Sequence, residues 1–114
     1  MLNFNAEQVV HNPNFAGLFD EYGFLLNPDL WTEVLAEKIA HLQGLGSLGE
    51  KHWRVVHHIR AKYLEVGGVP TMRLVCRAVS LSKEEVYELF GGCLPVWRIA
   101  GLPDPGEEAR AYMS

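Results

Sequence analysis

The chain has 114 residues, 48% of them apolar, and a formal net charge of −4. This size and composition predict a single domain that buries one hydrophobic core without crosslinks or a metal. The charge balance disfavours general attraction to nucleic acid or an anionic membrane, and no segment approaches the roughly 20 consecutive apolar residues of a membrane span. Because the start of the chain lacks a cationic leader and the sequence holds only two cysteines, Cys76 and Cys93, we expect a cytoplasmic protein with reduced thiols.

The first third of the chain predicts a small β-hairpin followed by a helix. Apolar and polar residues alternate near the N-terminus, which favours a hairpin over residues 2–10. Asn27 suits the cap of a helix over residues 28–43, because its side chain can accept a hydrogen bond from the first turn. Glu33 and Glu37 are expected to point away from the core. The apolar face of this helix consists of Trp31, Val34, Leu35, Ile39 and Leu42.

A longer helix is expected between residues 47 and 67. Ser47 and Glu50 have the S-x-x-E spacing of a reciprocal N-terminal cap, and Gly67 is a typical residue to end a helix. The side chains predicted to face the core are Trp53, Val56, Ile59, Tyr63 and Leu64.

Two shorter helices follow, with the proportions of a helix-turn-helix. The first begins near residues 70–71 and carries Arg73 and Arg77 one turn apart on one side. Its opposite, apolar side consists of Met72, Val75, Cys76 and Val79. The second covers residues 83–90, and Ser82 opens it with a second S-x-x-E spacing.

The last 24 residues, 91–114, contain four glycines and three prolines, which oppose a long helix or a central strand. No helix is expected to start at Cys93. Several side chains in this segment are nevertheless too apolar for water, namely Leu94, Val96, Trp97, Ile99 and Leu102. The sequence therefore predicts a helical body over residues 1–90 and, in the same domain, an arm over residues 91–114 that docks on another surface.

These elements predict a mainly α fold. We expect a compact bundle of about four to five helices, including the helix-turn-helix-like segment, with a small N-terminal hairpin and a C-terminal arm. If the arm is separate from the core, deleting residues 99–114 should leave the body folded and remove the capture of a partner.

Several short blocks, taken together and in this order, carry more information than any one of them: Tyr22-Gly23-Phe24-Leu25, Trp31, His52-Trp53-Arg54-Val55-Val56, Ile59-Arg60, Tyr63, Pro70, Arg73, Leu89-Phe90 and Ile99-Ala100-Gly101-Leu102-Pro103-Asp104-Pro105. They resemble the DsrC/TusE family of sulfur-relay proteins over nearly the whole chain. The resemblance implies a mainly helical fold with an N-terminal hairpin and an arm that carries a persulfide or forms a bond with a second arm cysteine. Members of the family deliver sulfur to tRNA-modifying enzymes, or act with dissimilatory sulfite reductase.

The chain departs from this family at both thiols. Met113 stands where the family has a cysteine next to last, and Trp97 stands at the position of the second arm cysteine. The resemblance thus implies a protein partner, similar to sulfite reductase or to the sulfurtransferases of tRNA thiolation, without the family's own thiol chemistry. We expect a non-catalytic, partner-binding or regulatory paralogue that uses Arg73, Arg77, Trp97, Ile99, Leu102 and Pro103.

Two alternatives belong to other functional classes. Cys93 is the only thiol of the predicted arm and could accept sulfur, whereas Cys76 is expected to pack in the core. The helix-turn-helix-like segment could instead bind DNA, but residues 83–88 hold three acids and one lysine, which the phosphates would repel.

No metal, cofactor or enzymatic turnover is predicted. His52 and His57 are five residues apart on a helix and diverge by about 140°, whereas helical metal pairs favour a spacing of four. The sequence also contains no glycine-rich phosphate loop and no arrangement of nucleophile and base.

Overall fold

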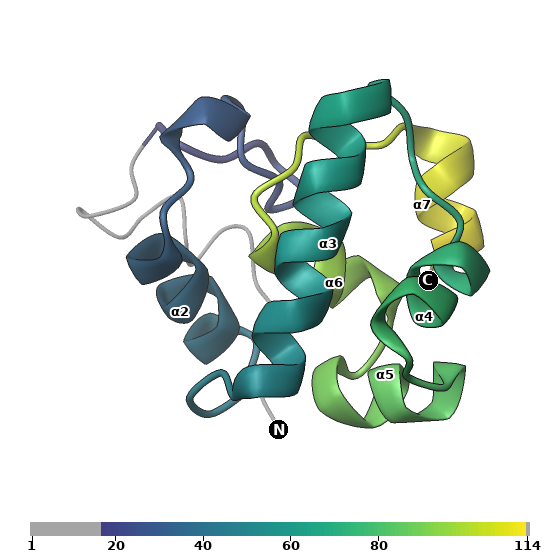
Figure 1. Ribbon diagram of the computed structural model, residues 1–114. Helices are drawn as coiled ribbons and strands as arrows, with labels where there is room; N and C mark the ends of the chain where they lie inside the picture. Colours follow the sequence, from purple (N-terminus) through teal and green to yellow (C-terminus); the bar gives the residue numbers. More distant parts are fainter. Residues whose placement is uncertain (1–16, 114) are drawn as a thin grey trace.

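Six α-helices and one 3-10 turn make up the fold in residues 17–113, the part of the chain that the computed structural model describes (Figure 1). The mainly helical prediction is confirmed. The elements are η1 (Pro28–Leu30), α2 (Glu33–Leu42), α3 (Glu50–Val66), α4 (Met72–Val79), α5 (Lys83–Phe90), α6 (Cys93–Ile99) and α7 (Glu107–Met113). Within the described residues the β structure is a single bridge between Phe19 and Leu25, and the hairpin predicted over residues 2–10 lies outside them.

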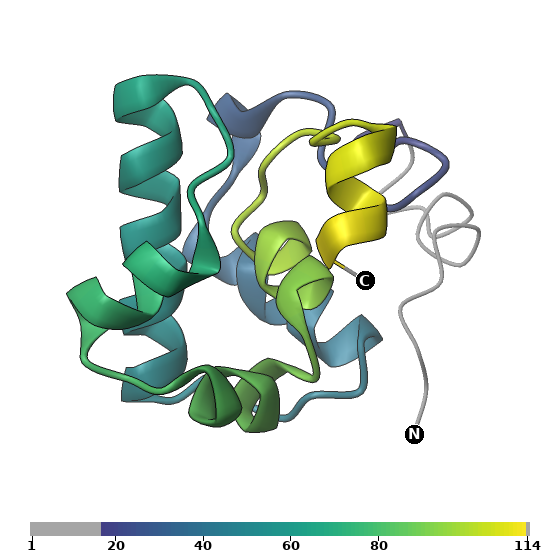
Figure 2. The same cartoon turned by 90° about the vertical axis from the view of Figure 1, so that its right-hand side faces the viewer.

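Helix α6 occupies the centre of the molecule. It packs against α2, α3, α5 and α7, and α3 also contacts α4 and α5 (Figures 1 and 2). Three of its seven residues, Val96, Trp97 and Ile99, have no exposed surface. Burial of so much apolar surface in one short helix makes it the main hydrophobic contribution to the core.

The predicted helix over residues 28–43 is wrong in its first part. Asn27 accepts a hydrogen bond from the backbone of Asp29 at 3.0 Å, as a cap should, but only the short turn η1 follows. The backbone is extended at Trp31, and Thr32 then caps α2 by accepting a bond from Leu35 N at 3.0 Å. Because the Thr32 side chain accepts a hydrogen bond from a free N–H group in the first turn of α2, a new helix begins there and η1 is not continued.

This break moves the apolar face of α2. Val34, predicted in the core, is 67% exposed, while Leu35 and Ile39 are buried as predicted. Glu37, predicted to point away, accepts a hydrogen bond from the backbone of Leu48 at 3.1 Å.

The predicted Ser47–Glu50 capping box is also wrong. Helix α3 begins at Glu50 with Gly49 as its cap, and Nδ1 of His52 accepts the Gly49 N–H at 3.1 Å. Since Leu48 is buried and its N–H is bound to Glu37, the chain enters the helix two residues later than the spacing predicts.

The body of α3 follows the predicted face in part. Val56 and Ile59 are buried, but Leu64 is 58% exposed, and Val55 is buried in addition. The predicted stop is confirmed, because Gly67 adopts the left-handed conformation with φ of 74°.

Helices α4 and α5 match the predictions closely. Thr71 caps α4, and Ser82 and Glu85 form both bonds of a capping box, each 3.1 Å long. Val75, Cys76 and Val79 are buried, whereas Arg73 is exposed.

The expectation that no helix starts at Cys93 is wrong, since α6 begins there. Pro95 does not prevent this helix, because it lies in the first turn, where a missing N–H costs no helical bond. The prolines and glycine at residues 103–106 instead separate α6 from α7. The predicted boundary after residue 90 therefore does not divide a body from a free arm, since residues 93–102 belong to the core (Figure 2).

Candidate functional site

Two side chains hold the backbone that follows α6. Nε1 of Trp31 donates a hydrogen bond to the carbonyl of Ile99 at 2.8 Å, and a guanidinium nitrogen of Arg60 donates to the carbonyl of Ala100 at 2.8 Å. Arg60 also donates to Pro28 O at 3.2 Å, and its guanidinium lies 4.3 Å from the centre of the Trp31 ring. We call this group of five residues the clamp.

Gly101 completes the contact between the clamp and the chain. Its φ is 66°, and a Cβ added there would lie 2.1 Å from Cδ1 of Trp31. Only glycine combines this backbone conformation with so close an approach of the indole ring.

The next turn is fixed in the same way. Nε1 of Trp97 donates to the carbonyl of Pro103 at 2.7 Å, and Leu102 is fully buried. The clamp and Trp97 therefore bond to the backbone carbonyls of residues 99, 100 and 103 in the motif at residues 99–105, which is one of the blocks of the resemblance. Trp31 and Arg60 belong to other blocks, so these separated blocks meet at one structural site.

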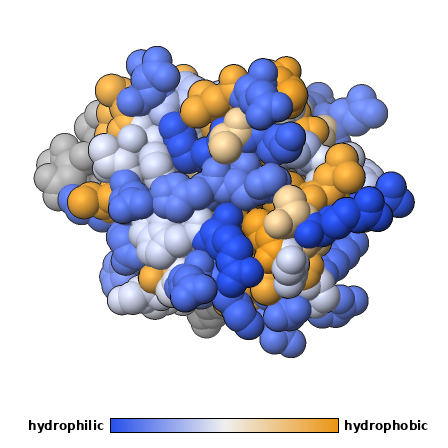
Figure 3. Space-filling view, in the orientation of Figure 1, coloured by the Kyte–Doolittle hydropathy of each residue, from blue (hydrophilic) through white to orange (hydrophobic). Residues whose placement is uncertain are grey.

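The six residues predicted to bind a partner fall into two groups. Arg73 and Arg77 are exposed on α4, beside Leu74, which is 53% exposed. In the space-filling view of this side, apolar and strongly hydrophilic side chains lie next to each other over the right-hand half (Figure 3). The other four residues lie elsewhere: Trp97, Ile99 and Leu102 have no exposed surface, and Pro103 is half-buried.

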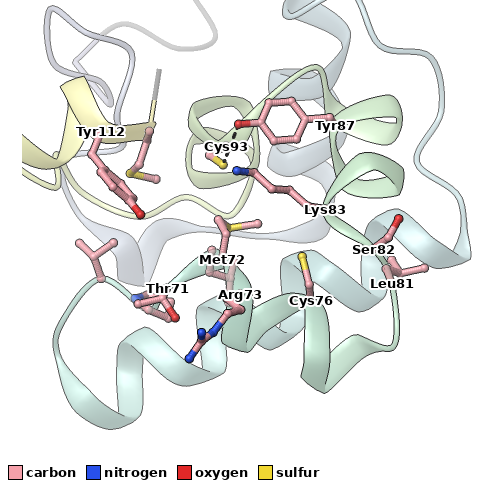
Figure 4. Close-up of a pocket in the computed structure, with 14 residues that line it drawn as sticks. Thr71, Met72, Arg73, Cys76, Leu81, Ser82, Lys83, Tyr87, Cys93 and Tyr112 are labelled. Atoms are coloured by element: carbon pink, nitrogen blue, oxygen red, sulfur yellow. Dashed lines mark hydrogen bonds between the residues drawn. The ribbon is translucent and has the colours of Figure 1, made fainter.

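Both cysteines line one cavity of about 720 Å³ (Figure 4). Its walls come from α3, α4, α5, the start of α6, the end of α7, the loop at residues 69–71 and the turn at residues 81–82. Its lining includes Val69, Met72, Arg73, Cys76, Lys83, Tyr87, Cys93, Tyr112 and Met113. Sequence reasoning missed this cavity, because its walls come from seven parts of the chain whose contact no local pattern indicates.

The two thiols differ in their surroundings. Burial raises the pKa of the Cys76 thiol, the neighbouring Cys93 raises it further, and Lys83 opposes the effect. The Cys93 thiol donates a hydrogen bond to the Tyr87 hydroxyl at 3.8 Å, and this bond raises the pKa of Tyr87. Cys76 is 9% exposed and Cys93 is 6% exposed, so neither thiol is presented at the surface in the way that transfer to a protein partner requires, although both line the cavity.

The histidines form structural contacts. His52 accepts a bond at Nδ1, so its Nε2 carries the proton and donates to the carbonyl of Leu89 at 2.9 Å. His57 contacts Glu33 at 2.9 Å and stacks on Trp53, with 5.5 Å between ring centres. Within residues 17–113, no group of three or more histidine, cysteine or acidic side chains is placed to hold a metal, and no helix there is both long and apolar enough to cross a membrane.

Comparison with known proteins finds a family model and curated relatives of the same family. The family model described as "DsrC like protein" matches residues 14–107. The sulfurtransferase TusE of Sodalis glossinidius is 35% identical over 95 residues, which cover 75% of this chain and 87% of that protein. The sulfurtransferase TusE of Escherichia coli is 36% identical over 95 residues, which cover 75% and 86%.

Solved structures give the same family of folds. The oxidized gamma-subunit of dissimilatory sulfite reductase (DsrC) from Archaeoglobus fulgidus superposes with a TM-score of 0.71 at 29% identity, over 78% of this chain and 89% of that one. The NMR structure of DsrC from Allochromatium vinosum gives a TM-score of 0.64 at 33% identity, over 78% and 87%.

Proposed function

Because this chain belongs to the DsrC-like family of sulfur-relay proteins, we propose that it acts in sulfur metabolism as a non-catalytic member that binds a protein partner. The burial of both cysteines is the observation that supports this proposal most directly. A relay protein must present a thiolate to a donor and then to an acceptor, whereas a binding protein needs only a complementary surface. Two relatives are named as a sulfurtransferase and as a subunit of dissimilatory sulfite reductase, and these define the classes of partner to test.

The exposed face of α4 is the best-supported place of contact. Arg73 and Arg77 place two positive charges on this face, although the chain as a whole has a net charge of −4, and Leu74 is exposed beside them. Arginine beside an apolar side chain is a composition enriched at protein interfaces, and the charges favour an acidic partner surface. A role for Trp97, Ile99 and Leu102 in binding would require this segment to leave the core.

The test measures capture of two partners, the sulfite reductase catalytic complex and a TusE-partner sulfurtransferase, by the purified chain. We expect the chain to retain one of them, and the variant R73E/R77E to lose at least about tenfold in affinity. The matched variant K38E/K62E changes the net charge equally at exposed sites on α2 and α3, and should bind normally. Equal loss in both variants, or no capture of either partner, would refute the proposal.

A second function is favoured by one observation, the position of Cys93 in the wall of a cavity that Lys83 also lines. In this alternative the Cys93 thiolate attacks the outer sulfur of a donor persulfide, forms a Cys93 persulfide and releases the donor thiolate. Incubation with a persulfide donor, followed by intact-mass analysis, distinguishes the two functions. A gain of one sulfur atom that C93S abolishes and C76S retains would support the carrier and count against a non-catalytic role.

A further inference from the structure

The cavity that contains both thiols has the size and lining of a ligand site. Its volume of about 720 Å³ lies within the roughly 300–1,000 Å³ typical of small-molecule pockets. Most of its lining side chains are apolar or weakly polar, including Ile59, Val69, Met72, Leu81 and Met113. Such a lining favours a ligand with a hydrocarbon or aromatic body.

The charged residues of the cavity all have the same sign. Arg73 and Lys83 line it, while none of its fourteen lining residues is an aspartate or a glutamate. In Figure 4 the Lys83 side chain extends from α5 toward the middle of the group of lining residues. Its ammonium lies 5.7 Å from the centre of the Tyr87 ring.

From this combination we propose that the cavity binds a small amphipathic carboxylate, with its apolar body among the methionine and thiol side chains and its carboxylate near Lys83 and Arg73. A carboxylate would pair with the two cations of the lining, and a hydrocarbon body would replace water along its apolar part. Neither feature alone selects the ligand, since a neutral apolar molecule leaves the cations unpaired and a simple anion leaves the apolar wall in water.

One wall of the site is the short helix α7, which is held by the buried side chain of Met113 and by the polar contacts of Arg110. Tyr112 of α7 lines the cavity and is 90% exposed. The apolar body of a ligand could pack against its ring and remove part of the ring from water. Helix α7 is attached through Arg110, whose Nε lies 3.0 Å from Asp104 and whose guanidinium lies 3.8 Å from the centre of the Tyr22 ring. Met113 is the buried residue of α7 and itself lines the cavity, so a ligand would contact the end of this helix directly.

The test is calorimetric titration of the full chain with decanoate below its micelle concentration, beside decanol and the decyltrimethylammonium cation. We expect saturable binding of decanoate with one site, weaker binding of decanol and none of the cation. In R73Q/K83Q the affinity for decanoate should fall by about tenfold while that for decanol stays unchanged. The matched variant R77Q/K51Q removes the same charge from neighbouring positions that do not line the cavity, and should bind decanoate normally.

Thiol labelling tests where the ligand binds, by a measurement that does not depend on the calorimetric titration. Saturating decanoate should slow the reaction of Cys76 and Cys93 with iodoacetamide several-fold in the wild-type chain, as both line the site. Two results would overturn the proposal: equal affinity for decanoate in both double variants, or binding without protection of either thiol. Equal binding of decanol and decanoate by the wild-type chain would also contradict it, by showing an apolar pocket without selection for the anion.

Discussion

Gly101 and Trp31 are packed so closely that neither residue can be changed without affecting the other. The indole ring occupies the space where any other residue would place its Cβ, and the same ring donates to Ile99 and lies against Arg60. A single added methyl group therefore disturbs several contacts of the clamp together. Because Ile99, Ala100 and Leu102 are fully buried, the chain has little freedom to move aside.

We expect G101A to lower the free energy of unfolding by about 3 kcal/mol, because the strain of a positive φ and the overlap with Trp31 add to each other. The matched variant G67A has a similar φ of 74° and no atom within 4 Å of the added Cβ, so it should lose only about 1 kcal/mol. Urea unfolding followed by fluorescence measures both. Similar losses in the two variants would mean that the indole ring moves away without cost.

Cys76 gives a prediction about pH. In C93S it is the only thiol, and burial, the main cause of its raised pKa, remains. The rate of reaction with iodoacetamide should rise with pH around a midpoint above that of the same chain unfolded in urea. A thiol whose pKa is raised by folding stabilises the fold below its unfolded pKa, and this contribution is lost as pH rises toward the folded pKa. Coincident midpoints in the folded and unfolded chains would contradict the inferred burial effect.

At the level of the helices, two identical sequence spacings have different outcomes. Ser82 and Glu85 form a capping box, while Ser47 and Glu50 do not, because Gly49 and His52 take over the cap of α3. Local spacing predicts a cap correctly only where the neighbouring backbone makes no hydrogen bond to a distant part of the chain. Here the bond from Leu48 N to Glu37, eleven residues away, is that contact.

The variants S82A and S47A test this difference. S82A removes an acceptor for the first turn of α5 and should cost about 1 kcal/mol in the free energy of unfolding. S47A should stay within about 0.5 kcal/mol of the wild type, as expected for a surface residue outside a cap. Both values come from urea unfolding under the same conditions, and a larger loss in S47A would indicate that the predicted cap forms in solution.

The same reasoning explains which elements could be predicted from the sequence. Helices α4 and α5 and the stop at Gly67 depend on local caps and glycines, and these predictions are confirmed. Helix α6 could not be predicted in this way, because its stability comes from burial against four other elements. Of the candidate site, the residues of the clamp lie in or beside blocks of the resemblance, but only the fold brings Trp31 and Arg60 to the carbonyls of residues 99 and 100.

For the whole molecule, the segment predicted as an arm is a central part of the structure. Its apolar residues avoid water by packing within their own chain, which satisfies the same physical requirement as docking on a partner. The motif at residues 99–105 thus supplies buried side chains and backbone acceptors to the core, and its presence does not by itself indicate an exposed binding arm.

Two truncations distinguish these roles. Deleting residues 99–114 removes Ile99 and Leu102, each contributing about 2 kcal/mol of burial, and also the acceptors for Trp31 and Arg60. Against a total stability of about 5–15 kcal/mol, this loss should abolish cooperative unfolding, contrary to the expectation of an intact body. Deleting residues 107–114 removes α7, in which Met113 is the buried residue, and keeps the clamp.

Circular dichroism during heating and proton NMR compare the two truncated chains with the full chain. The chain ending at residue 106 should retain a cooperative transition and dispersed methyl signals, with a modestly lower melting temperature. The chain ending at residue 98 should lack both, because Trp97 loses the Pro103 carbonyl and its covering residues at the same time. A cooperative transition in the shorter chain would mean that residues 99–102 add little to the core, and the segment would then regain its interpretation as a detachable arm.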